Sequence, residues 1–210
     1  MLFQPQNLEQ LISHLKRQGV LKSAKIETAL RQVDRKKFVP AHLIDQAYAD
    51  RPLPLAEGQT ISQPTTVVFM LELLDVRAGQ KVLDIGAGSG WVSCLLAELV
   101  GDKGEVYALE INKTVAQIGL KNIKNFGASN IVYRQADAAK VWADYAPYDR
   151  IHCAAAFDKI PTDLLNQLTV GGILVAPTQD NYIYKIIRQD KNNFSQEKYF
   201  GFVFVPFVKS

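Results

Sequence analysis

The spacing of apolar residues in the first third of the chain is helical. Over residues 8–18, leucine and isoleucine recur at i, i+3, i+4 and i+7 behind Asn7, a residue type that caps helix N-termini. The same spacing returns behind Ser23 and predicts a second helix that ends before Pro40, because a residue that precedes proline avoids the helical conformation. A third helix is predicted over residues 67–74. We expect the first two helices to form a flank or lid.

The stretch over residues 51–64 interrupts these helices. Pro52 and Pro54 fix the backbone and remove hydrogen-bond donors, so this stretch is predicted to be extended and to continue as an ordered loop. A loop of this length inside a compact chain is usually functional.

The second half of the chain has short apolar runs separated by helical patterns. These runs are residues 82–85, 106–109, 131–133, 151–153 and 173–175. Their alternation with helices predicts a mostly parallel sheet flanked by helices, an α/β fold. Residues 182–188 and 199–208 are predicted to form an antiparallel hairpin at the sheet edge. We expect one globular unit, in which residues 1–78 form a helical extension and residues 79–210 form the core.

Composition is that of an ordinary globular protein. Of 210 residues, 48% are hydrophobic and 21% are charged, which excludes disordered and fibrous classes. The 24 basic and 21 acidic residues give a formal charge of +3, and the basic residues are scattered. The densest basic stretch, from Arg31 to Lys37, is interpreted as a solvated helix end. The sequence therefore predicts neither a nucleic-acid partner nor a membrane partner.

The cysteines and histidines suggest neither a metal site nor a disulfide. Cys94 and Cys153 lie far apart in apolar segments, which predicts free buried thiols in a reducing, cytoplasmic compartment. His14, His42 and His152 do not cluster, and His152 is interpreted as a core residue. No secretory signal pattern and no run of 18 apolar residues is present.

A glycine turn follows the first predicted strand. The strand over residues 81–85, which contains Asp84, runs into small residues and then into a helix that begins near Trp91. This order of strand, turn and helix binds a nucleotide-like group at a helix N-terminus. Glycine lets the backbone approach a ligand closely, and the Asp84 carboxylate can accept a hydrogen bond. The turn consists of Gly86, Ala87, Gly88, Ser89 and Gly90.

The residues of this turn exclude phosphate-binding motifs. The dinucleotide fingerprint needs a third glycine where Trp91 stands, and the P-loop sequence Gly-Lys-Ser/Thr is absent. Acidic residues follow the next two strands instead. Glu110 is placed to accept both hydroxyls of an adenosine ribose, and Asp137 is placed to receive an adenine amino group.

Together, these residues resemble the S-adenosylmethionine site of class I methyltransferases. The resemblance implies a Rossmann-like fold in which Asp84 and the glycine turn hold the methionine part of the cofactor. Glu110 would then hold the ribose, and Asp137 with Ala138 beside it would hold the adenine. The indole of Trp91 would pack near the cofactor or, alternatively, in the core.

A second resemblance covers nearly the whole chain. Asp50-Arg51-Pro52-Leu53-Pro54, followed by Gly58-Gln59-Thr60-Ile61-Ser62-Gln63-Pro64, resembles the signature loop of protein-L-isoaspartate O-methyltransferases. It continues through residues 146–149, 160–168, 171–172 and 204–206. The family methylates the free α-carboxylate of L-isoaspartyl residues in damaged proteins with S-adenosylmethionine, which leaves S-adenosylhomocysteine. The ester then collapses to a succinimide, which can reopen as aspartate.

The resemblance makes Ser62 the catalytic serine. The substrate carboxylate is itself the nucleophile, so the enzyme needs no general base and mainly has to align it with the methyl group. A serine hydroxyl can hold one carboxylate oxygen while the other attacks. Without the motif around it, Ser62 would be interpreted as a turn residue. The expected substrate-binding residues are Thr60, Ile61, Ser62, Ala156, Phe157, Val205 and Pro206.

Three loops depart from the family pattern. Ala156-Phe157 stands where the family has alanine followed by proline, Ala138 replaces a glycine, and Thr178-Gln179 replaces Val-Gly. A glycine lost at a position of positive φ would leave Ala138 strained. These changes weaken the substrate assignment more than the cofactor assignment.

The altered loops leave functions other than the repair reaction open. A relative with an altered substrate, such as a small-molecule carboxyl or amine methyltransferase, and a non-catalytic cofactor-binding module are the alternatives. A nucleic-acid amine methyltransferase would need an Asp/Asn-Pro-Pro-aromatic tetrad after residues 151–153, which is absent. Cys153 lacks the neighbours of a cytosine-attacking thiolate. We expect a monomer, with a dimer as the alternative.

Overall fold

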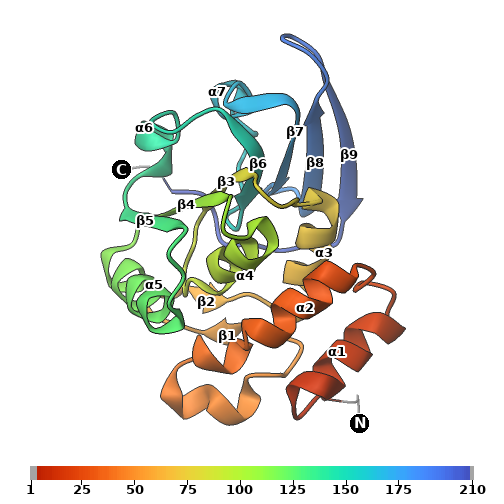
Figure 1. Cartoon of the computed structure of the whole chain (residues 1–210), viewed down its shortest axis with the longest axis vertical. Helices are drawn as coiled ribbons and strands as arrows, with labels where there is room; N and C mark the ends of the chain where they lie inside the picture. Colours follow the sequence, from red (N-terminus) through yellow and green to blue (C-terminus); the bar gives the residue numbers. More distant parts are fainter. Residues whose placement is uncertain (1–3, 209–210) are drawn as a thin grey trace.

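The structure, a computed structural model, describes residues 4–208, and at Val141 the backbone alone. A seven-stranded sheet in the order β5-β4-β3-β6-β7-β8-β9 forms its centre (Figure 1). The first five strands in chain order pair in parallel, and β8 and β9 complete the edge as antiparallel strands. The strands are β3 (Lys81–Ile85), β4 (Glu105–Glu110), β5 (Ile131–Gln135), β6 (Tyr148–Cys153), β7 (Leu168–Pro177), β8 (Tyr182–Arg188) and β9 (Phe194–Phe200). The predicted α/β class and parallel sheet are confirmed.

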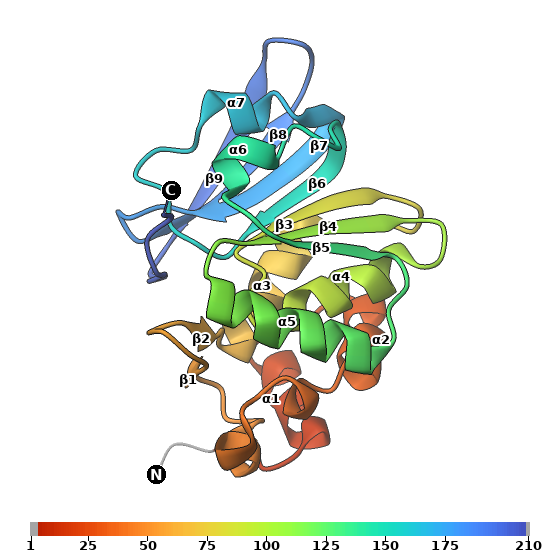
Figure 2. The same ribbon diagram turned by 90° about the vertical axis from the view of Figure 1, so that its left-hand side faces the viewer.

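Helices cover both faces of the sheet. They are α1 (Leu8–Arg17), α2 (Ala24–Gln32), α3 (Pro64–Leu74), α4 (Trp91–Val100), α5 (Lys113–Phe126), α6 (Ala138–Val141) and α7 (Thr162–Leu165). Figure 2 shows α3, α4 and α5 on one face and the short helices α6 and α7 on the other. Within residues 4–208, no helix is long and apolar enough to cross a membrane.

Alternating side chains of the strands supply two hydrophobic cores. Val82 of β3 belongs to the core shared with the helices α1 to α4, whereas Leu83 and Ile85 belong to the core beneath α6 and α7. This division follows from the two-residue period of a strand, which sends successive side chains to opposite faces. Burial on both faces explains why β3 and β4, at the centre of the sheet, are mostly apolar.

Helix α2 packs against α4, and α1 shares the same hydrophobic core. Asn7 caps α1 as predicted, and its Oδ1 accepts the N–H of Gln10 at 2.9 Å. The indole N–H of Trp91, the first residue of α4, donates to the carbonyl of Val33 at 3.1 Å. The helices therefore flank the layer of α3, α4 and α5.

Helix α2 is shorter than expected. It ends because Val33 leaves the helical conformation, and Asp34 then caps a new 3-10 turn by accepting the N–H of Lys36.

The rest of this connection is ordered. Two 3-10 segments, η1 (Arg35–Lys37) and η2 (Ala41–Gln46), lead into a small antiparallel pair of strands. In that pair, β1 (Leu53–Pro54) runs beside β2 (Thr60–Ile61), so the extended loop predicted from its prolines folds back on itself.

The last strand differs from the prediction. The second strand of the terminal hairpin was expected over residues 199–208, but β9 ends at Phe200. Gly201 has a φ of +105°, and its N–H and that of Phe202 both donate to the carbonyl of Asn181, which turns the chain away from the sheet edge. The following residues run back over the sheet, where Pro206 pairs with Ala156.

Candidate active site

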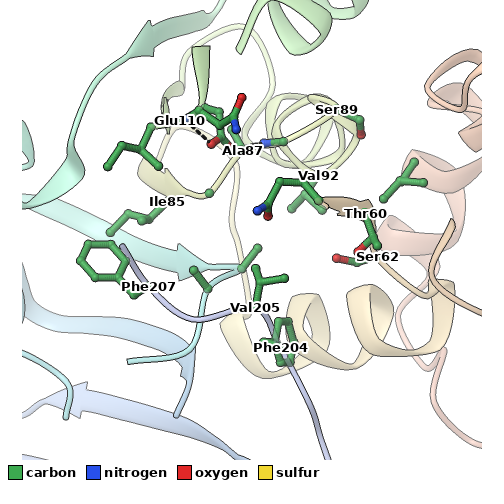
Figure 3. Close-up of a pocket in the computed structure, with 18 of the residues that line it drawn as sticks. Thr60, Ser62, Ile85, Ala87, Ser89, Val92, Glu110, Phe204, Val205 and Phe207 are labelled. Carbon is green, nitrogen blue, oxygen red and sulfur yellow. Dashed lines mark hydrogen bonds between the residues drawn. The ribbon is translucent and has the colours of Figure 1, made fainter. Parts of the chain in front are cut away.

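A cavity of about 570 Å³ lies at the carboxyl ends of β3, β4 and β6. Three stretches far apart in the chain line it: residues 59–63 after β1, the glycine turn with the neighbouring strand ends, and residues 203–208. In Figure 3, Ser62 lies on one side of the cavity, Glu110 on the opposite side, and Val205 on the C-terminal segment between them. Ligands of open α/β sheets bind at this end of the strands.

The glycine turn is held against the next strand. The amides of Gly86 and Ala87 both donate to the carbonyl of Leu109, at 2.9 and 3.1 Å. Gly90 has a φ of +81°, and a Cβ there would lie 2.8 Å from Cγ1 of Ile123. Only glycine therefore fits at the point where the turn enters α4.

Helix α5 and strand β5 support the turn from outside. The Asn122 amide donates to the Ser89 carbonyl at 2.9 Å, and the Tyr133 hydroxyl donates to the Gly88 carbonyl at 3.3 Å. Burial raises the pKa of Tyr133, so its hydroxyl stays protonated and remains a donor. A Cβ on Gly119 would lie 2.4 Å from both the Gly88 carbonyl oxygen and the Tyr133 hydroxyl, so this glycine permits the close packing.

Glu110 is the only charged residue among the described residues that line the cavity. Its carboxylate accepts the N–H of Gly88 at 3.0 Å and that of Asn112 at 2.9 Å, one on each oxygen. Burial raises the pKa of Glu110, and the backbone hydrogen bonds to its charged form oppose that shift. A carboxylate has about four lone-pair sites, so it keeps acceptor capacity for ligand hydroxyls.

Asp84 lies outside the cavity lining. It is fully buried; its Oδ1 lies 2.8 Å from Nδ1 of His152, and its Oδ2 accepts the Ser93 hydroxyl at 2.6 Å. The sequence predicted that Asp84 contacts the cofactor directly. In the structure, both of its oxygens are instead hydrogen-bonded within the protein. Asp84 instead ties β3 to β6 and to α4 beneath the glycine turn, and His152 is the satisfied core residue that was predicted.

Asp137 and Ala138 lie where β5 leads into α6. The Asp137 side chain accepts the N–H of Ala139 at 3.0 Å and caps α6, and its neighbours Ala136 and Ala138 line the cavity while Asp137 itself does not. Ala138 is the first residue of a regular helix, so the alanine at this position carries no positive-φ strain. That departure from the family pattern leaves the loop intact.

The signature loop brings all three of its predicted residues to the cavity. Thr60, Ile61 and Ser62 line it, and Figure 3 shows the Ser62 hydroxyl directed into the space. Val205 and Pro206 line the same cavity from the C-terminal segment. The structure therefore brings together the predicted serine and two residues near the other end of the chain.

Ala156 and Phe157 require a correction. Both are 2% exposed and neither lines the cavity. The Phe157 ring packs 4.5 Å from that of Phe207, and Ala156 exchanges backbone hydrogen bonds with Val205 and Phe207. They were expected to contact substrate, but they fasten the C-terminal segment that does line the cavity.

Trp91 and Arg35 are both buried at this site. The sequence left the role of Trp91 open and did not indicate that Arg35 is buried. Trp91 is 1% exposed, its indole N–H is hydrogen-bonded in the core, and it also lines the cavity. Arg35, interpreted as part of a solvated face, is also 1% exposed, whereas Lys36 and Lys37 beside it are exposed. No local signal in the basic stretch distinguishes Arg35 from its neighbours.

Both cysteines are free and buried. Burial raises the pKa of Cys94 and of Cys153 to about 12, so the reactive thiolate is scarce at neutral pH. We expect no reaction of the native protein with a disulfide thiol reagent over minutes, and reaction of both thiols in urea. Spectrophotometric titration checks this, with the denatured protein as the control; one thiol titrating in the native protein would contradict it.

The fold and the site define an S-adenosylmethionine-dependent methyltransferase. A parallel sheet whose first strand enters a glycine turn, with an acidic residue at the end of the next strand, is the arrangement in which open α/β sheets bind adenosine-bearing ligands at the carboxyl ends of their strands. Residues 6–210 match the family described as protein-L-isoaspartate(D-aspartate) O-methyltransferase. The chain belongs to this family.

Individual relatives are similar over almost the full length of this chain. A protein-L-isoaspartate O-methyltransferase of Ignicoccus hospitalis is 38% identical over 204 residues, which are 95% of this chain and 96% of the relative. One of Aeropyrum pernix is 41% identical over 94% of this chain and 78% of its own length. A crystal structure of a Plasmodium falciparum protein described under the same family name, in complex with S-adenosyl-L-homocysteine, superposes with a TM-score of 0.89. It is 24% identical, over 98% of this chain and all of that one, and thus supports the fold.

Proposed function

We propose that the cavity transfers a methyl group from S-adenosylmethionine to the free α-carboxylate of L-isoaspartyl residues in damaged proteins. The observation that carries this proposal is the placement of Ser62 and Glu110 on opposite sides of one cavity. On one side is the Ser62 hydroxyl, and on the other is the Glu110 carboxylate. Among the described lining residues, no base accompanies the hydroxyl and no phosphate-binding cation accompanies the carboxylate. That combination suits a carboxylate acceptor and an adenosine-bearing cofactor.

The reaction needs alignment more than proton transfer. One oxygen of the substrate carboxylate forms a bond to the methyl carbon as the carbon–sulfur bond breaks, and the electron pair of that bond stays on sulfur. The carboxylate anion becomes a neutral ester, and the sulfonium becomes the neutral thioether of S-adenosylhomocysteine. No proton moves, so holding the two groups in line supplies most of the rate enhancement.

The cofactor side is assigned to four features. The glycine turn holds the methionine part, with Asp84 fixing the turn from below through His152 and Ser93. Glu110 accepts the ribose hydroxyls, and the residues around Asp137 receive the adenine. Burial raises the pKa of Glu110, and the backbone hydrogen bonds to its charged form oppose that shift, as ribose hydroxyls donating to the carboxylate would.

The substrate side is assigned to the signature loop and the C-terminal segment. Ser62 donates a hydrogen bond to one oxygen of the substrate carboxylate and leaves the other to attack. Thr60, Ile61, Val205 and Pro206 contact the peptide around the isoaspartyl residue. The structure supports this side because Phe157 packs away from the cavity and leaves it open.

Location and assembly complete the proposal. We propose a cytoplasmic protein that acts as a monomer on isoaspartyl proteins and not on nucleic acid. Two free buried thiols favour a reducing compartment, and the scattered basic residues favour no nucleic-acid partner.

The deciding experiment is methyl transfer from labelled S-adenosylmethionine to a short peptide that contains isoaspartate. The identical peptide with aspartate serves as the control, and cofactor affinity is measured on the same preparation. We expect label in the isoaspartyl peptide alone. Cofactor binding without transfer to that peptide would favour an altered substrate or a binding module and would overturn the proposed reaction.

A further inference from the structure

Arg35 is a buried cation directly behind the signature loop. Its guanidinium nitrogens donate to five backbone carbonyls within residues 47–62. The shortest of these contacts are those to Ala47, at 2.6 Å, and Ser62, at 3.0 Å; the bond to Ile61 measures 3.3 Å. The remaining acceptors are the carbonyls of Ala49 and Arg51.

This arrangement is costly to build. Burying a cation is unfavourable unless its donors are satisfied, and no carboxylate is hydrogen-bonded to Arg35 within the described chain. Burial lowers the pKa of Arg35 to about 10, while the nearby Asp50 charge opposes that shift, so the group remains charged at neutral pH. The rigid fork of five donors is the property that lysine lacks.

The carbonyls that Arg35 holds determine where the neighbouring amides point. In a trans peptide the N–H of the next residue is directed opposite to the carbonyl. The bonds to the Ile61 and Ser62 carbonyls therefore turn the amides of Ser62 and Gln63 away from Arg35. Within residues 4–208, the structure records no acceptor for either amide, and both residues line the cavity.

Arg35 also contacts the cofactor side of the site. Its guanidinium carbon lies 5.4 Å from the centre of the Trp91 ring, and Trp91 begins α4 directly after the glycine turn. Trp91 lines the cavity as well. One buried side chain thus packs against both elements that must be aligned for transfer.

We infer that Arg35 is the positioning residue for the methyl acceptor, an inference that rests on the proposed function. It holds the Ile61 and Ser62 carbonyls so that the Ser62 hydroxyl and the Ser62 and Gln63 amides face the substrate carboxylate. The described residues that line the cavity include no cation. The charge of Arg35, behind the loop, therefore attracts the substrate carboxylate. The acceptor it serves is an anionic main-chain carboxylate.

Two substitutions separate geometry from charge. Arg35→Lys keeps the charge but loses the five-donor fork, and we expect kcat for the isoaspartyl peptide to fall about tenfold with little change in KM. Arg35→Met also loses the charge, and we expect KM for the peptide to rise about tenfold further. Lys37→Met removes an exposed charge two residues away and should leave both constants unchanged. Affinity for S-adenosylhomocysteine, which carries no acceptor carboxylate, should change less than about threefold in all three variants.

A double-mutant cycle tests whether Arg35 acts through Ser62. Residues that act through one contact are not additive, so Ser62→Ala should cost less in the Arg35→Met background than in the wild type. Fully additive losses, or wild-type constants in Arg35→Met, would overturn the inference. Methyl transfer by the wild-type protein to the isoaspartyl peptide is measured first. If the wild type transfers the methyl group and the Arg35 variants do so equally well, this inference alone is overturned. If the wild type transfers nothing, the proposed function is overturned as well.

A measurement on the unaltered protein covers the case in which the variants do not fold. Arginine labelled with ¹⁵N reports the guanidinium signals of Arg35, and the isoaspartyl peptide is added in the presence of S-adenosylhomocysteine. We expect the Arg35 signals to shift with this peptide and to stay unchanged with the aspartyl peptide. Peptide binding detected by calorimetry without any shift of the Arg35 signals would contradict the inference.

Discussion

Replacing Glu110 with alanine is expected to weaken cofactor binding by about 1–3 kcal/mol, the loss of charge-assisted hydrogen bonds to the ribose. The same carboxylate accepts the Gly88 amide, so its removal also loosens the glycine turn. Calorimetric titration with S-adenosylhomocysteine measures the effect. Glu110→Gln, which keeps one acceptor, should lose less.

The pH dependence of binding gives an independent measure of the Glu110 contact. Hydroxyls donate to the ionised carboxylate, and burial raises the pKa of Glu110. The affinity for S-adenosylhomocysteine should therefore be highest above that pKa and should fall as the pH drops through it. This fall should begin at a higher pH than it would for a glutamate with an ordinary pKa. Glu105→Ala, at the exposed start of the same strand, is the matched control and should bind as the wild type does. Unchanged affinity in Glu110→Ala would remove Glu110 from the cofactor site.

Replacing Ser62 with alanine is expected to slow methyl transfer by about 10- to 100-fold, the cost of one hydrogen bond to a charged group. The fall should appear in kcat/KM for the isoaspartyl peptide, because the contact is made to the reacting carboxylate. Cofactor affinity should remain at the wild-type value, since Ser62 lies across the cavity from Glu110.

A matched serine tests whether the effect is specific. Ser195 lies in β9, outside the cavity lining, and Ser195→Ala should have the wild-type rate. A Ser62→Ala enzyme as fast as the wild type would leave Ser62 as a structural residue of its loop. Equal losses of rate and of cofactor affinity would indicate instead that the variant distorts the whole cavity.

Local spacing of residue types determined most of the fold before the structure was known. Five apolar runs that alternate with helical patterns predicted the parallel strands, because a strand buried on both faces is apolar at most of its positions. The cap at Asn7 and the glycine turn at Gly86 to Gly90 were equally predictable, since both depend on a few adjacent residues. The order of Asp84, Glu110 and Asp137 along the chain predicted one end of the sheet as the site for the same reason: parallel strands end at a common edge.

Tertiary contacts decided what these residues touch. Asp84 ends a strand beside the turn, as predicted, but His152 and Ser93 occupy its oxygens, and both approach from other elements. Phe157 follows a strand end, yet Phe207, fifty residues later, covers its ring and keeps it from the cavity. The residues that supply these partners are remote in sequence, so no local pattern contains them.

Arg35 shows most clearly the difference between what the local sequence determines and what tertiary contacts decide. By sequence it is one of several basic residues in a polar stretch, and Lys36 and Lys37 beside it are exposed. The carbonyls that accept from its two terminal nitrogens come from residues 47–62, and the ring it packs against begins a helix more than fifty residues away. Periodicity and motifs thus determined the elements and their order, because those depend on neighbours along the chain. Burial and pairing of polar groups depended on neighbours in space, which only the folded chain brings together.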